Sequence, residues 1–194
     1  MSDRQPDDAG PSEPPTGPER GLDVRRTSRE LPILLLLALV AALLIRAFVF
    51  QIFSIPSVSM RPTLERGDRV LVCEICGLVD DVDRGDVIVF EGPDDQDYIK
   101  RVAGLPGDRV ELHQGTLFVN GVAVDEPYLA PNEDLDPYGP TLVPDGMLFV
   151  LGDNRARSGD SRFDPPAGVG LVPVDLVVGE ALAIVWPPSR IGGV

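Results

Sequence analysis

Proton-transfer chemistry has few candidate residues in this chain of 194 amino acids. All but one of its 17 lysine and arginine residues are arginine, and there is a single histidine. Arginine does not lose its proton in a protein, so Lys100 and His113 are the two basic side chains that can act as a base. His113 lies in a short β-like run that approaches a turn at Gly115, where we expect a surface residue. Lys100 is therefore the candidate base.

Ser57 and Ser59 are candidate partners of that base, in a segment where Pro56 and Pro62 restrict the backbone. A serine hydroxyl is a weak nucleophile unless a neighbouring group removes its proton. For Lys100 to do so at neutral pH, its pKa must fall by roughly three units from a reference near 10.4, equivalent to about 4 kcal/mol. Burial away from any carboxylate shifts the pKa of an ammonium in that direction.

The sequence around Lys100 favours such burial. Tyr98 and Ile99 precede it and Val102 follows closely, while Arg101 points to the opposite face if the segment is a strand. Simpler interpretations remain: Lys100 is a strand lysine facing water, and the nearby serines are ordinary loop or capping residues.

A long apolar run precedes these residues. Leu31–Ile45 contains no charged residue, and the run continues past Arg46 to Phe53. Because it is apolar on every face, it does not resemble an amphipathic core helix. Because a long segment precedes it and no clean cleavage site ends it, a removed signal peptide also fits poorly. We therefore predict a retained transmembrane helix over residues 27–53, held in the lipid bilayer of the cell membrane as a single pass.

Charge around the run predicts its orientation. Four arginines stand before it: Arg20, Arg25, Arg26 and Arg29. The positive-inside rule then places the N-terminus in the cytoplasm and residues 54–194 outside it. Residues 1–20 are rich in Pro, Asp, Glu, Gly and Ser, so we predict a disordered cytoplasmic tail that extends to residue 26.

Residues 54–194 are predicted to form a mainly β domain built on a coiled antiparallel sheet. Asn120-Gly121, between two apolar runs, is a strong signal for a two-residue hairpin turn. Residues 125–146 contain five prolines and are predicted to be a long irregular connection. Short runs rich in β-branched and aromatic residues recur between turn signals, at residues 69–72, 86–90, 98–102, 109–112, 116–119, 147–151 and 181–186.

Charge and cysteine content exclude some functions. The chain has 31 acidic residues and a net charge of −14, which repels phosphates, so no nucleic-acid partner is expected.

Cys73 and Cys76 have the spacing of a disulfide, a redox pair or half of a metal site. Because the chain has no second cysteine pair, zinc is not expected, and a disulfide is favoured over free thiols. The acids at 80–83 fit a cation-binding cluster or, more simply, a solvated turn.

Four segments stand out, in this order along the chain: IPSVSMRPTL (55–64), RGDVIVF (84–90), YIKRVAGLPGD (98–108) and GDNRARSGDSR (152–162). Taken together, they resemble the boxes of bacterial type I signal peptidases. The resemblance spans residues 31–186. It implies a membrane-bound serine endopeptidase that uses a Ser/Lys dyad, without metal or cofactor, to cleave signal peptides from exported preproteins, near the secretion translocon.

The resemblance implies a role for each matching residue. Ser59 is the nucleophile and Lys100 is the general base. The Ser57 hydroxyl and the Ser59 backbone N–H form the oxyanion hole. Ser158 would hold Lys100 in place.

Other matching positions imply support and substrate binding. Asp160 and Arg162 resemble a structural ion pair behind the site, and residues 153–155 are expected to stabilise a turn. Val58 stands where the family often has a smaller residue, so the pocket wall is expected to differ here. Small substrate side chains would enter shallow apolar pockets formed by Phe53, Ile55, Met60, Leu64 and Ile99.

Two other functions fit parts of the sequence. One is a related Ser/Lys protease with a narrower task, such as processing a pilus or conjugation protein or cleaving itself, which the four segments do not distinguish. The other is a non-enzymatic membrane-anchored β module, against which the intact Ser59 and Lys100 argue.

Overall fold

The computed structural model describes residues 24–76, 82–130 and 136–194. The chain forms two compact units, Met1–Ala41 and Ala42–Val194. Two sequence predictions lie wholly or partly outside the described residues: most of the N-terminal tail, and residues 80 and 81 of the acidic cluster.

The first described element is helix α1 (Val24–Val49), which includes Pro32. All side chains from Leu31 to Ala42 are exposed. Among the residues that the structure describes, no helix combines the length and the apolarity needed to cross a membrane.

The predicted helix over 27–53 is wrong at its C-terminal end, because the last residues form strand β1 (Phe50–Ser54). This strand pairs antiparallel with β2 (Arg69–Cys73), from Phe50 opposite Cys73 to Ser54 opposite Arg69. Aromatic and β-branched residues favour a strand when a neighbouring strand satisfies the backbone N–H and C=O groups. The β structure therefore begins at Phe50 and not at residue 54.

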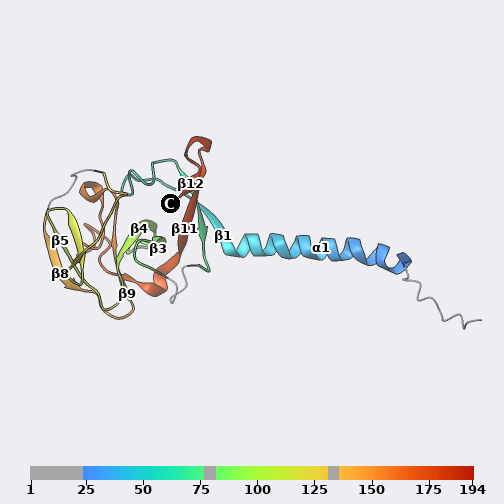
Figure 1. The fold of residues 1–194 in the computed structure, drawn as a ribbon, viewed down its shortest axis with the longest axis horizontal. Helices are drawn as coiled ribbons and strands as arrows, with labels where there is room; N and C mark the ends of the chain where they lie inside the picture. The colour runs from blue at the N-terminus through green and yellow to red at the C-terminus, as the bar shows by residue number, and fades with distance from the viewer. Residues whose placement is uncertain (1–23, 77–81, 131–135) are drawn as a thin grey trace, which may run out of the picture. The chain divides into compact units, whose positions relative to one another are not determined.

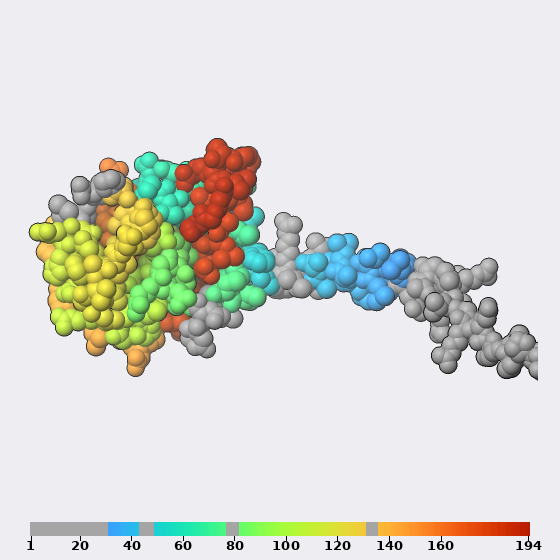
Figure 2. All heavy atoms as spheres, in the orientation of Figure 1, coloured from blue at the N-terminus to red at the C-terminus, as the bar shows by residue number. Residues whose placement is uncertain are grey.

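An eight-stranded antiparallel sheet forms much of the unit Ala42–Val194 (Figure 1). Its order is β1, β2, β11, β3, β4, β9 and β10, and β12 pairs with β11. Because β11 lies between β2 and β3, the end of the chain completes a sheet begun by its earliest strands; Figure 2 shows the red C-terminal residues against the cyan and green ones. The remaining bounds are β3 (Val87–Glu91), β4 (Asp97–Gly104), β9 (Met147–Leu151), β10 (Val172–Pro173), β11 (Val177–Trp186) and β12 (Gly192–Gly193).

A second, four-stranded sheet has the order β7, β6, β5, β8. Asn120 and Gly121 have φ values of 54° and 79° between β6 and β7, which confirms the predicted hairpin turn. Strand β8 corrects the prediction that 125–146 is wholly irregular. It contains Pro140 and lies at the edge of the sheet, where a missing N–H is tolerated. The bounds are β5 (Arg109–His113), β6 (Thr116–Val119), β7 (Val122–Ala123) and β8 (Tyr138–Leu142).

The segment after β1 is anchored by the apolar core. Ile55, Met60 and Leu64 are at most 3% exposed and pack with Val70 and Val72 of β2 in one cluster. Burial of such side chains contributes about 1.5–3 kcal/mol each. These buried side chains therefore fix the turn that carries Ser59 to the core. The described part of the chain also contains three short 3₁₀ helices: η1 (Arg155–Arg157), η2 (Val174–Leu176) and η3 (Pro188–Arg190).

The two cysteines form a disulfide. Cys73 at the end of β2 is bonded to Cys76 in the turn that follows, the pairing favoured from the sequence.

Candidate active site

Ser59 and Lys100 meet although they are 41 positions apart in the sequence. Ser59 lies in a turn after β1, and Lys100 lies in β4 opposite Ile88 of β3. The Lys100 Nζ donates one hydrogen bond to Ser59 Oγ at 3.0 Å and another to the Ile99 carbonyl at 2.9 Å. The Ser57 hydroxyl lies 3.2 Å from Ser59 Oγ. The structure thus brings together the three residues expected to do the chemistry.

The surroundings of Lys100 disfavour its ammonium form. Lys100 is 3% exposed, and no carboxylate of the described residues forms an ion pair with it. Burial lowers the pKa of Lys100 from 10.5 to about 8, against a smaller opposing effect of the charges on Asp160 and Asp153. A neutral amine is therefore populated near neutral pH, as a general base requires.

Asp153 and Asn154 hold the loop that carries Ser59. The Asn154 backbone N–H donates to the Ser59 carbonyl at 2.9 Å, and its Nδ2 donates to the Val58 carbonyl at 3.1 Å. The Thr63 hydroxyl donates to Asp153 Oδ2 at 2.5 Å. We expected these residues to stabilise only their own turn; they also fix the loop at and after Ser59.

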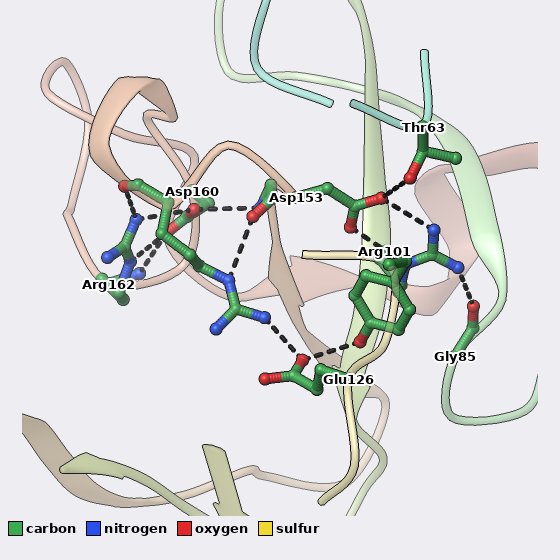
Figure 3. Close-up of polar contacts among 10 residues, drawn as sticks. Thr63, Gly85, Arg101, Glu126, Asp153, Asp160 and Arg162 are labelled. Atoms are coloured by element: carbon green, nitrogen blue, oxygen red, sulfur yellow. Dashed lines mark hydrogen bonds and ion pairs between the residues drawn. The ribbon is translucent and has the colours of Figure 1, made fainter. Parts of the chain in front are cut away.

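Arg101, next to Lys100 in β4, carries a paired charge. Its Nε and Nη2 donate to the two carboxylate oxygens of Asp153 at 2.9 and 2.7 Å, and its Nη1 donates to the Gly85 carbonyl at 2.7 Å (Figure 3). Its guanidinium lies 3.9 Å from the centre of the Tyr128 ring. Burial alone would lower the pKa of Arg101, but the hydrogen bonds and charge of Asp153 outweigh it and raise the pKa. Arg101 is therefore a fixed cation that ties β4 to the segment 153–154.

Asp160 and Arg162 form an ion pair, with 2.8 Å between Arg162 Nε and Asp160 Oδ1. Asp160 is fully buried, and its Oδ2 accepts a hydrogen bond from the Gly152 N–H at 3.0 Å. Arg162 also donates to the Arg155 carbonyl at 2.6 Å (Figure 3). The pair thus binds both arms of the loop 152–162.

Ser158 is buried close to the site, but its hydroxyl has no hydrogen-bond partner among the described residues. Its side chain packs on Gly152, where an added Cβ would collide with Ser158 and with the Ser59 carbonyl. The expected bond from Ser158 to Lys100 is not formed in this structure, so its orienting role stays a prediction.

An open cleft of about 250 Å³ lies over Ser57, Ser59 and Lys100. Some of its other walls come from the motif segments 98–108 and 152–162, whereas the wall at residues 166–168 comes from a segment in which the sequence shows no obvious chemistry. In the structure a glycine is required at position 168, because a Cβ there would collide with the Asp160 and Phe163 carbonyls. The other lining residues are Tyr98, Arg157, Gly159, Pro166, Ala167 and Gly168.

Glu126 and Tyr128 support the site from the segment predicted to be irregular. Glu126 Oε1 accepts hydrogen bonds from Arg155 Nη2 at 2.5 Å and from the Tyr128 hydroxyl at 2.6 Å. Burial and the Glu126 carboxylate raise the pKa of Tyr128 above its usual range. No local pattern predicts the contact between Glu126 and Arg155, because it joins residues 29 positions apart in the sequence.

Comparison with known proteins identifies the family. Residues 28–186 match the family described as signal peptidase, peptidase S26. Signal peptidase I of Bacillus licheniformis is 39% identical, covering 81% of this chain and 88% of its own, and signal peptidase I S of Bacillus subtilis (strain 168) is 41% identical, covering 79% and 86%. A solved signal peptidase I from Enterococcus faecalis V583 is 37% identical, with a TM-score of 0.46 over 53% of this chain and 97% of that one. The chain belongs to the signal peptidase family, peptidase S26.

Membership of the signal peptidase family confirms the recognition made from the four segments. The chain is a serine endopeptidase that cleaves signal peptides, so the alternative of a non-enzymatic β module is not supported.

The apolar residues expected to bind substrate lie together in this signal peptidase. All five belong to one hydrophobic cluster. Met60 and Leu64 are 0% exposed, so in this structure they support the wall from behind. Ile55 and Ile99 are also buried, at 3% and 7% exposed, whereas Phe53 is half-buried and is the member of the five with the most exposed side chain.

Proposed function

We propose that this chain hydrolyses one peptide bond per exported preprotein with Ser59 as nucleophile and Lys100 as general base. The observation that supports the proposal best is the buried Lys100 amine, 3.0 Å from Ser59 Oγ and without a carboxylate partner. With a pKa of about 8, roughly one-tenth of Lys100 is neutral at pH 7 and half at pH 8.

In the acylation step, neutral Lys100 removes the proton of Ser59 as Ser59 Oγ attacks the substrate carbonyl. The neutral amine accepts this proton through its lone pair, while one of its N–H groups still donates to the Ile99 carbonyl. The protonated Lys100 then gives the proton to the departing amine of the substrate. Water attacks the acyl-enzyme next, with Lys100 again acting as base, and releases the signal peptide.

The negative charge that develops on the carbonyl oxygen needs donors beside Ser59. We assign the Ser57 hydroxyl and the Ser59 backbone N–H to this oxyanion hole. Two features support the assignment: Ser57 Oγ lies 3.2 Å from Ser59 Oγ, and the Ser59 N–H has no acceptor among the described residues. The Asn154 bonds to the Ser59 and Val58 carbonyls would keep these donors in place.

The remaining predicted residues take supporting roles in the proposal. Asp160 and Arg162 hold the loop that packs behind the site, and Ser158 accepts a hydrogen bond from Lys100 when substrate is bound. Phe53, Ile55 and Ile99 form the apolar wall for small substrate side chains, with Met60 and Leu64 behind it.

We further propose that α1 anchors the peptidase in the cell membrane, with its N-terminus in the cytoplasm and the β unit outside. The exposed apolar side chains from Leu31 to Ala42 support a lipid environment. Confinement of enzyme and signal peptide to one membrane raises their effective concentration without any new contact, and it would place cleavage near the secretion translocon.

The test compares Ser59→Ala and Lys100→Arg with Ser189→Ala and Arg109→Lys, which make similar changes at exposed positions. The full chain in detergent is assayed on a preprotein and on a peptide that spans its cleavage site. We expect kcat/KM to fall by at least about 10³-fold for the first pair and to stay unchanged for the second. If both site variants cleave like the unsubstituted chain, the Ser/Lys mechanism is wrong.

A further inference from the structure

A second hollow lies next to the catalytic cleft. It has a volume of about 470 Å³, and its polar residues are Arg61, Glu65, Asn154 and Arg157. Arg157 lines the catalytic cleft as well, and Asn154 holds the Ser59 carbonyl. The loop that carries Ser59 lines both hollows, with Ser59 in the catalytic cleft and Arg61 in the second hollow. A peptide lying over Ser59 can therefore extend from one hollow into the other.

Arg157 gives this hollow an unbalanced positive charge. Arg61 and Glu65 form an ion pair at 2.8 Å, so their charges cancel. Arg157 is exposed, and among the described residues its side chain has no ion-pair or hydrogen-bond partner. By contrast, its neighbour Arg155 is paired with Glu126. The positive charge of Arg157 is therefore opposite in sign to the net charge of the chain, which is −14.

We propose that the second hollow binds the residues that follow the scissile bond, and that Arg157 selects substrates with an Asp or Glu side chain there. This inference rests on the proposed function, which assigns the apolar wall of Phe53, Ile55 and Ile99 to residues before the bond. The polar hollow on the other part of the Ser59 loop then receives the residues after it. A carboxylate complements the planar guanidinium of Arg157, while a substrate lysine is repelled.

The test uses the full chain and peptides that are identical up to the scissile bond. The first three positions after the bond are varied one at a time, and each varied position carries Asp, Ala or Lys. We expect kcat/KM to be about three- to fivefold higher for the best Asp peptide than for the matched Lys peptide, as an exposed ion pair allows. Raising the salt concentration should shrink this ratio.

Arg157→Glu and Arg157→Ala are then compared with Arg109→Ala, which removes an arginine that lines neither hollow. Arg157→Glu should reverse the Asp-to-Lys ratio, Arg157→Ala should bring it close to one, and Arg109→Ala should leave it as it was. An unchanged ratio in Arg157→Glu overturns the inference, as does an Asp-to-Lys ratio of about one in the unsubstituted chain. Both results leave the proposed function intact, because that is tested separately by Ser59→Ala on the Ala peptide.

Discussion

Lys100 and Arg101 are neighbours on β4, both are buried, and the protein treats their charges in opposite ways. Arg101 meets both oxygens of Asp153, the Gly85 carbonyl and the Tyr128 ring. Lys100 donates to a hydroxyl and a carbonyl and lies near the Tyr98 ring, and no carboxylate of the described residues pairs with it. A buried cation with a carboxylate partner keeps its proton, whereas one without a partner tends to lose it. One face of β4 thus carries Arg101, which supports the structure, and the other face carries Lys100, the proposed base.

Arg101→Met tests the supporting face and should have the largest effect on stability. It leaves Asp153, whose side chain is 1% exposed, as a buried and unpaired carboxylate. We expect the free energy of unfolding to fall by about 3–5 kcal/mol, measured by denaturant unfolding followed by circular dichroism. Arg109→Met at an exposed position should change it by less than about 0.5 kcal/mol. Equal effects of the two substitutions would show that the Asp153 pair contributes nothing special.

Lys100→Met makes the same substitution on the other face and should act in the opposite direction. The folded chain has a Lys100 pKa of about 8, against 10.5 when exposed, so at lower pH the fold must bury an ammonium. Between pH 8 and 10.5 the unfolded chain holds a proton that the folded chain has released, so the stability of the unsubstituted chain rises with pH across this window. Lys100→Met removes the burial cost, so it should stabilise the inactive chain by about 1–3 kcal/mol at pH 7.

The gain from Lys100→Met should shrink as the pH rises from 8 to 10.5, because the unsubstituted chain then buries a neutral amine. Unfolding curves at pH 7 and pH 10 measure this difference. A loss of stability at pH 7 would contradict the account, since it would mean that the ammonium of Lys100 is satisfied in the fold.

Giving Lys100 a carboxylate neighbour should make it resemble Arg101. The Tyr98 ring centre lies 5.7 Å from Lys100 Nζ, so Tyr98→Glu brings a negative charge close to the amine. We expect the rise of kcat/KM with pH, which follows loss of the Lys100 proton, to move upward by about one pH unit. Tyr98→Gln has the same shape without the charge and should not move it. Coincident pH profiles for the two variants would indicate that Lys100 is not the titrating base.

The comparison also shows what the sequence could predict. The strands follow from short runs of β-branched and aromatic residues between turn signals, and the base follows from the scarcity of groups that can lose a proton. The face on which Arg101 points follows from strand geometry. These are local properties. Motifs that resembled a known family supplied the pairing of Ser59 with Lys100, which no local pattern contains.

Other features could not be predicted from the sequence, because they depend on contacts between distant segments. Residues 50–53 were predicted to be the end of an apolar helix, but they form a strand because β2 provides a partner. Strand β8 was hidden by its proline, which only an edge position tolerates. The hydrogen bond from Asn154 to the Val58 carbonyl joins residues 96 positions apart, and the full burial of Met60 depends on several strands together.

The most direct test of the account is the pKa of Lys100 itself. Because the chain contains one lysine, incorporation of lysine labelled with ¹³C at Cε gives a single side-chain resonance whose shift can be followed with pH. The account predicts a titration midpoint near 8 in the folded chain, returning to about 10.5 on unfolding. A midpoint at or above 10.5 in the folded chain would contradict the claim that Lys100 is a neutralised base.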